Sequence, residues 1–146
     1  MDLTRYVPAE ITVLDDKAAK GAGTAFVAKG YVHKGLVVAT EGMAAGDSVV
    51  IKVYASNSDV QPTWVDGSDD PAAATKANRI APVALKDLDA GTTIAGSTGV
   101  TISNSNGVKR YEINDNYGAW FNVLVTTYTD ANSSSKVSAF VTLSNN

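Results

Sequence analysis

Apolar and polar side chains alternate along several short segments of this chain, as they do in a β-strand with one buried face. The clearest case is Asp47–Ser56, where Val49, Ile51 and Val53 share one face and polar residues occupy much of the other. Lys136–Leu143 alternates in the same way. The pattern therefore predicts strands that each contribute one apolar face to a common core.

Similar segments follow one another along most of the chain and predict eight to ten short antiparallel strands linked by hairpins. The segments are Glu10–Leu14, Thr24–Ala28, Tyr31–Thr40, Asp47–Ser56, Asn78–Leu88, Thr92–Ala95, Val100–Ser103, Val108–Asn114, Ala119–Thr129 and Lys136–Leu143. Ala119–Thr129 begins apolar on both faces, which is typical of a central strand covered on both sides. Two packed sheets would bury these faces, so we expect an all-β antiparallel sandwich, either a jelly roll or an immunoglobulin-like fold.

Turn residues add detail to this expectation. Asn106-Gly107 stands between two strand segments and predicts a tight hairpin, so that the last third of the chain forms a meander. Pro82 lacks an N–H group and suits an edge strand. Asp70-Pro71 has the residue types of a helix N-cap and first helical position, which predicts one or two helical turns after it.

The organisation along the chain is simple. Residues 1–9 have no clear strand pattern and predict an N-terminal arm, and residues 10–146 predict a single sandwich domain. The longest stretch without a strand signal, residues 57–77, contains Trp64 and the acidic segment Asp66–Asp70. A long loop in a compact domain is often functional.

The composition agrees with the strand pattern and excludes several functions. The chain has 146 residues with 18 Val and 14 Thr but only 3 Glu, a bias towards β-branched residues. A net charge of −3 gives no basic surface for nucleic acid, and the absence of cysteine excludes disulfides and thiolate metal sites. No signal peptide or membrane-spanning segment is visible. We therefore expect synthesis in the cytoplasm and neither nucleic acid nor membrane as a partner.

Candidate chemistry is sparse. The single histidine, His33, lies inside a strand pattern without a serine elbow or paired acid to make a triad. Asp66, Ser68 and Asp70 alternate as in a calcium loop, but Pro71 stands where that loop needs glycine and Ala77 where it needs glutamate. Solvated loop carboxylates explain the acidic segment better, although the sequence leaves ion binding there open. We expect no enzyme activity, no cofactor and no metal.

Aromatic residues offer candidate binding positions instead. Trp64 in the long loop and Tyr117 in a turn are free to serve an interface or to stack on a sugar ring. Trp120 and Phe121 begin the most apolar strand segment, so we expect both in the core.

The run Val108–Val125, followed by Tyr128 and the final strand segment from Lys136, resembles small virion proteins of tailed bacteriophages that decorate or cement the capsid. Gly96–Gly99 before the predicted hairpin adds to the resemblance, which spans Tyr31–Leu143. It carries no diagnostic motif, so no residue role is transferred from that family.

The resemblance implies a non-enzymatic protein on the capsid surface that binds joints between major capsid protein subunits. It also implies a homo-oligomer, with a trimer preferred. In this hypothesis Leu3, Tyr6 and Val7 anchor the arm on a neighbour, and Trp64 and Tyr117 contribute to an interface. The alternative is a phage tail, fibre or adhesin-like module that recognises a glycan or a protein.

Overall fold

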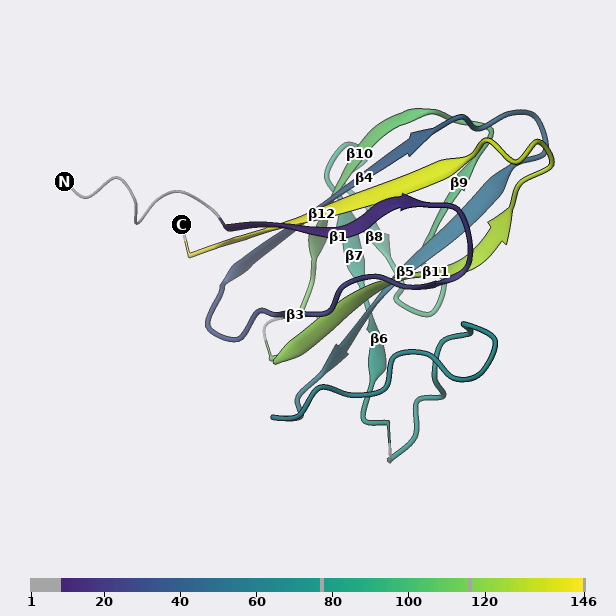
Figure 1. Ribbon diagram of the computed structural model, residues 1–146. Helices are drawn as coiled ribbons and strands as arrows, with labels where there is room; N and C mark the ends of the chain where they lie inside the picture. The colour runs from purple at the N-terminus through teal and green to yellow at the C-terminus, as the bar shows by residue number, and fades with distance from the viewer. Residues whose placement is uncertain (1–8, 77, 116, 146) are drawn as a thin grey trace.

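The computed structural model describes residues 9–76, 78–115 and 117–145, and these fold as two antiparallel sheets packed face to face (Figure 1). The predicted all-β sandwich is confirmed. Sheet A contains, in spatial order, β1 (Ala9–Lys17), β12 (Lys136–Ser144), β4 (His33–Glu41), β10 (Gly107–Ile113), β7 (Leu85–Asp87) and β8 (Thr93–Ile94). Sheet B contains β2 (Gly21–Ala22), β11 (Trp120–Thr129), β5 (Ser48–Ser56) and β6 (Ala81–Val83). Two more strands belong to sheet B. β3 (Phe26–Val27) pairs with β11, as β2 does, and β9 (Val100–Ser103) pairs with β5, as β6 does.

The strand order is that of a jelly roll. The short strands β2 and β3 pair with successive parts of β11, and β6 and β9 pair with opposite halves of β5, so each couple acts as one interrupted strand. Sheet A then has β1-β12-β4-β10 and sheet B has β2/β3-β11-β5-β6/β9. Successive strands of this set alternate between the sheets, except that β5 is followed by β6 in the same sheet. This alternation decides for the jelly roll over the immunoglobulin-like arrangement. The small strands β7 and β8 extend sheet A beyond β10.

The predicted hairpin at Asn106-Gly107 and the predicted meander are wrong. β9 pairs with β5 in sheet B, whereas β10 pairs with β4 and β7 in sheet A, so residues 104–106 cross from one sheet to the other. The Asn106 side chain accepts a hydrogen bond from Met43 N at 2.8 Å and donates one to Met43 O at 3.2 Å. The turn residues thus reverse the chain as expected, but they do not decide which strands pair.

The main core fills the space between the sheets. Val49, Ile51 and Val53 of β5 are fully buried in it, as their spacing predicts. Phe121 of β11 stacks on Phe26 of β3 with ring centroids 5.6 Å apart. Of the two aromatic residues predicted to lie in the core, Phe121 is fully buried and Trp120 is only half-buried.

A second, smaller core lies on the outer face of sheet B. Residues 57–80, which we call the cover segment, run across this face and bury Trp64, Ala72 and Ile80 against Tyr54 and Leu124. In Figure 1 the cover segment is the teal chain beneath the sandwich. Since β11 thereby has partners on both faces, its prediction as a central strand covered twice is confirmed.

Within its described residues the cover segment contains no helix after Pro71, although one hydrogen bond of helical spacing, from Arg79 N to Thr75 O at 2.9 Å, is present. Val65 and Pro71 form an isolated antiparallel bridge, and Ala72 N donates a hydrogen bond to Trp64 O at 2.9 Å. This pairing holds the backbone around Pro71 extended. Asp70 therefore does not cap a helix here, because the backbone next to it pairs with the segment around Val65 instead.

Two tyrosines make the stability of the fold sensitive to alkaline pH. Burial raises the pKa of Tyr111 in β10 to about 12, and burial together with Asp130 raises the pKa of Tyr128 in β11 to about 12. The Tyr128 hydroxyl lies 2.6 Å from Ser135 O and 3.0 Å from Asp130 Oδ2, both of which accept hydrogen bonds. In the unfolded chain both phenols ionise near their ordinary pKa of 10.0.

We therefore expect the free energy of unfolding to fall between about pH 10 and pH 12, because the unfolded chain releases these protons first. The contribution is complete below pH 10 and is lost as the pH rises through the folded-state pKa. Urea unfolding of the wild-type chain and of the Tyr111→Phe, Tyr128→Phe double variant across this pH range measures the contribution of the two tyrosines. The comparison cancels the effect of the lysines, which both chains share. An equally steep pH dependence in the double variant would contradict the assignment.

Candidate binding surfaces

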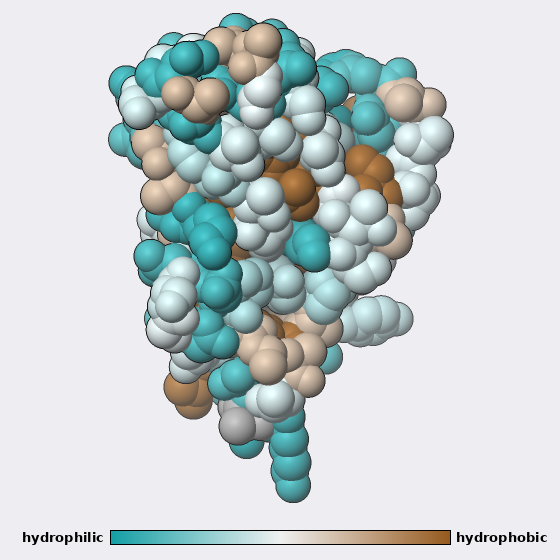
Figure 2. Space-filling model, turned by 90° about the vertical axis from the view of Figure 1, so that its right-hand side faces the viewer, coloured by the Kyte–Doolittle hydropathy of each residue, from teal (hydrophilic) through white to brown (hydrophobic). Residues whose placement is uncertain are grey.

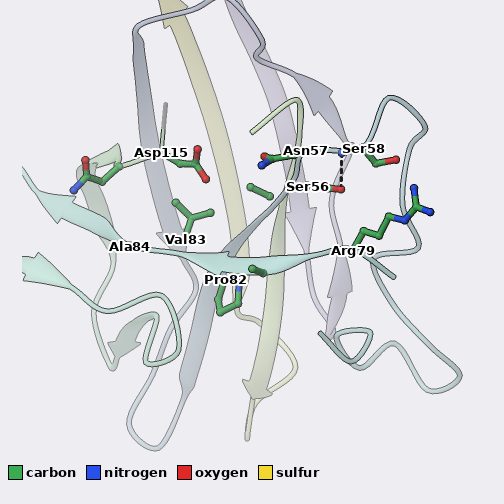
Figure 3. A pocket seen from close by; sticks show the side chains of 11 residues that line it. Ser56, Asn57, Ser58, Arg79, Pro82, Val83, Ala84 and Asp115 are labelled. Atoms are coloured by element: carbon green, nitrogen blue, oxygen red, sulfur yellow. Dashed lines mark hydrogen bonds between the residues drawn. The ribbon is translucent and has the colours of Figure 1, made fainter. Parts of the chain in front are cut away.

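A polar groove opens where β5 ends, beside β6 and the segment that follows β10 (Figure 3). Its volume is about 580 Å³, which is within the range of small-molecule sites. It is lined by Ala55, Ser56, Asn57, Ser58, Arg79, Ala81, Pro82, Val83, Ala84, Asn114 and Asp115. Small side chains from strand ends form much of its surface, and the polar groups come from loops.

Asp115 is held by the turn that contains it. Its Oδ1 accepts hydrogen bonds from Tyr117 N at 2.7 Å and Gly118 N at 2.8 Å, and its backbone oxygen accepts one from Lys34 Nζ at 2.7 Å. These contacts leave Oδ2 free of any hydrogen bond to the described residues. In Figure 3 the carboxylate and the Asn57 amide face each other across the groove.

Lys34, which helps to hold this turn, is only 1% exposed. Its Nζ also donates a hydrogen bond to Tyr31 O at 3.0 Å and lies 5.7 Å from the centroid of the Phe121 ring. Burial lowers the pKa of Lys34, and the nearby Asp115 opposes this shift. The buried ammonium thus joins the start of β4 to one wall of the groove.

Three further polar side chains of the groove have no partner within the described chain. The side chains of Asn57, Arg79 and Asn114 make no hydrogen bond or ion pair to another described residue. Arg79 lies at the opposite end of the groove from Asp115, beside Ser58 (Figure 3). Its backbone has a φ of 54°, an uncommon conformation for a residue other than glycine. The groove therefore presents several unused hydrogen-bonding groups.

A second candidate surface is the outer face of sheet A. Phe140 of β12 pairs across the sheet with Val37, and Ala39 of β4 pairs with Val108. Phe140, Val37 and Ala39 are half-buried, and Val108 is 65% exposed. A shallow hollow of about 290 Å³ lies over Phe140, Ala39 and Val108. On the side of the molecule shown in Figure 2, by comparison, hydrophobic residues form small separate areas among hydrophilic ones.

The structure places the predicted interface residues in different environments. Leu3, Tyr6 and Val7 lie outside the described residues. Tyr117 is 87% exposed, two residues beyond Asp115, and remains available for an interface. The expectation that Trp64 is free on the surface is wrong, because it is only 7% exposed and serves as an anchor of the cover segment. The two rings therefore do not form a joint stacking platform.

The acidic segment Asp66–Asp70 forms a tight loop. Asp66 N donates a hydrogen bond to Asp70 O at 3.0 Å, and the Asp70 carboxylate pairs with Lys20 Nζ at 2.7 Å. Within the described ranges, no three His, Asp or Glu side chains lie close enough together to hold a metal ion. His33 is exposed at the start of β4. No helix in the described part of the chain is long and apolar enough to span a membrane.

The groove residues were not singled out from the sequence. Asn57 follows the strand segment at 47–56, Asn114 ends the segment at 108–114 and Asp115 follows it, so each is a polar residue at a strand end. That signal is weak, since nearly every strand of this chain ends in polar residues. Only the topology shows that these two ends and Arg79 meet.

Comparison with known proteins gives one informative result. No protein-family model matches the chain, and no curated protein matches it in sequence. Among solved structures, it is similar to the SPBc2 prophage-derived protein YomS, with a TM-score of 0.52 and 14% sequence identity. The similarity covers 94% of this chain and 93% of that chain. At this identity the comparison shows a shared fold, which extends over nearly the whole of both chains.

Proposed function

We propose that this chain is a non-enzymatic structural protein of a phage virion that decorates or cements the capsid exterior by binding joints between major capsid protein subunits. The observation that carries the proposal is a jelly roll that spans nearly the whole chain and is shared with a prophage-derived protein. Jelly rolls recur in viral capsid domains, so this support is an analogy at the level of the fold. We further propose a homo-oligomer, preferably a trimer, on the capsid surface.

The outer face of sheet A is the surface that suits this role best. Its half-buried and exposed apolar residues, Val37, Ala39, Phe140 and Val108, form a centre that contact with a partner would dehydrate. Charged residues surround this centre, with Glu41 at one end and Arg110 beside Val37. An apolar centre with a polar rim is the usual arrangement of a protein interface.

The N-terminal arm is the second part of the proposed attachment. β1 begins at Ala9, at the edge of sheet A, where it pairs with Leu143 of β12. A segment that precedes this strand can reach a neighbouring subunit, with Leu3, Tyr6 and Val7 as its apolar anchors. Such contacts add buried area across a joint and raise the free energy needed to separate the subunits.

A density gradient of the lysate from the producing culture tests the proposal. We expect the chain to co-migrate with intact particles at many copies per particle, as measured by mass spectrometry of each fraction. Recovery in the soluble fractions alone would overturn the capsid role.

Variants then locate the attachment surface. Val108→Glu is expected to weaken binding to particles about tenfold or more, because it places a charge at the centre of the apolar face. Deletion of residues 1–8 should abolish binding while leaving the melting temperature unchanged. Val60→Glu is the matched control, since Val60 is 74% exposed but lies on the cover segment. Equal binding by Val108→Glu and Val60→Glu would exclude the face of sheet A.

A binding module of a phage tail, fibre or adhesin type is the second candidate. The polar groove favours it, because it offers unused hydrogen-bonding groups close to the exposed Tyr117. Migration with tails rather than heads in the same gradient would support this candidate.

A further inference from the structure

We propose that the groove between β5, β6 and the segment after β10 binds a neutral saccharide through Asn57, Arg79, Asn114 and Asp115. The proposal goes beyond a capsid role, and nothing in it depends on attachment to a particle.

The hydrogen-bonding groups of the groove match the hydroxyl groups of a sugar. The Arg79 guanidinium can only donate, the free Oδ2 of ionised Asp115 can only accept, and the amides of Asn57 and Asn114 do both. A sugar hydroxyl both donates and accepts, so the hydroxyls of a saccharide lying along the groove can bond to these groups. Apart from Asp115 Oδ1, which accepts hydrogen bonds from Tyr117 N and Gly118 N, these side chains make no hydrogen bond to another described residue. Binding through the remaining groups would therefore break no existing bond.

The rest of the lining suits the apolar side of a sugar ring. Ala81, Pro82, Val83 and Ala84 follow one another beside the groove and carry no polar side-chain atoms. Pro82 and Val83 point to opposite sides of the chain (Figure 3), and Val83 is buried in the main core. A pyranose ring places its C–H groups on its faces and its hydroxyls around its edge. The apolar side chains on the groove side of this stretch, with polar groups at both ends of the groove, complement a ring lying along it.

The charge and the edge geometry argue against other ligands. Among the described residues that line the groove, only Arg79 and Asp115 are charged, and their formal charges cancel, so these residues give no excess charge to attract a free ion. A peptide could bind by adding a strand to the outer edge of β6, but Pro82 in its centre has no N–H group to donate. A neutral ligand held by side chains fits these features better than an ion or a peptide strand.

The groove is separate from the apolar face of sheet A. The groove lies beside Asn114, which follows the end of β10 that pairs with Gly35 near the start of β4. The hollow on sheet A lies around Glu41, at the other end of β4. Six residues of an extended strand separate these ends by about 20 Å. Both surfaces can therefore be occupied together, and each can be tested without the other.

Amide chemical shifts of the ¹⁵N-labelled full chain test the proposal directly. The probes are lactose, cellobiose, maltotriose and N,N′-diacetylchitobiose, with glycylglycine and inorganic sulfate as competing classes. We expect at least one saccharide to shift the amides of residues 55–58, 79–84 and 114–115. No saccharide-dependent shift in these residues, or larger shifts with glycylglycine or sulfate, would overturn the proposal.

Two groove variants and a control follow for the saccharide that binds best. Asn57→Ala is expected to raise its Kd about tenfold through the loss of one or two hydrogen bonds. Asp115→Asn keeps an oxygen for the two turn N–H groups but replaces the free acceptor, so a similar loss is expected. Asn132→Ala, in the exposed β11–β12 loop, should leave the Kd unchanged. An unchanged Kd in both groove variants would refute the assignment, whereas Val108→Glu should bind the saccharide normally whether or not the chain attaches to capsids.

Discussion

Trp64→Ala is expected to lower the free energy of unfolding by about 3–5 kcal/mol, the usual cost of removing a buried aromatic ring. Trp64 is the largest side chain that the cover segment places on the outer face of sheet B, where it packs with Tyr54 and Leu124. Without the ring, the cover segment loses its anchor and Leu124 loses its protection from water. Urea unfolding followed by the fluorescence of Trp120, which remains in the variant, measures the loss.

Trp64→Phe is the informative control. The buried Trp64 Nε1 has no hydrogen-bond partner among the described residues, so the indole carries the penalty of an unsatisfied donor. Phenylalanine retains an aromatic ring and removes that donor, so we expect a much smaller loss than with alanine. If Trp64→Ala were as stable as Trp64→Phe, the second core would contribute little, and the cover segment would not depend on its anchor.

The faces of the long strands could be predicted from the sequence, but their neighbours could not. Alternation places Val49, Ile51 and Val53 on the buried face, because burial depends only on which side of the strand a residue occupies. It carries no information on pairing. β9 therefore looked like one arm of a hairpin with β10, although its partner is the N-terminal half of β5, about 50 residues earlier.

The number and the bounds of the shortest strands could not be predicted, for a different reason. The described residues form twelve strands where the pattern predicted eight to ten. β2 lies outside every predicted segment, and Asn78–Leu88 contains two strands, β6 and β7. The strands β2, β3, β6, β7 and β8 have only two or three residues each. Two residues cannot show alternation, so such strands are defined by the edge that they pair with. β2 and β3 exist as strands because β11 offers a free edge to them.

Residue type misled the prediction of the binding surface. A tryptophan in a long polar loop is a reasonable candidate for an exposed anchor, yet Trp64 is buried because the loop folds back onto a sheet that would otherwise expose Leu124. Lys34 gave no signal at all, since lysine in a strand is nearly always exposed. Its burial becomes understandable only when the Asp115 carbonyl, 81 residues later, is placed beside it.

Gly23→Ala is expected to destabilise the fold by about 3 kcal/mol, at the upper end of the usual cost of overpacking. Gly23 lies where the chain passes between the sheets, and its N donates a hydrogen bond to Val123 O of sheet B at 2.9 Å. The next residue, Thr24, donates through its N to Val13 O of sheet A at 2.9 Å. A Cβ on Gly23 would lie 2.2 Å from that same Val13 oxygen, which is backbone and cannot move aside cheaply.

Gly67→Ala is the matched control, because a Cβ there would have no heavy atom within 4 Å and the residue has no positive φ. We expect it to be neutral or slightly stabilising, since alanine reduces the conformational freedom of the unfolded chain. Thermal unfolding of both variants gives the comparison. Equal melting temperatures would mean that β1 can move away from β11 at little cost. A large drop in melting temperature for Gly23→Ala alone would instead show that the jelly roll requires the two sheets to approach closely at this position. The absence of a side chain on Gly23 permits this approach.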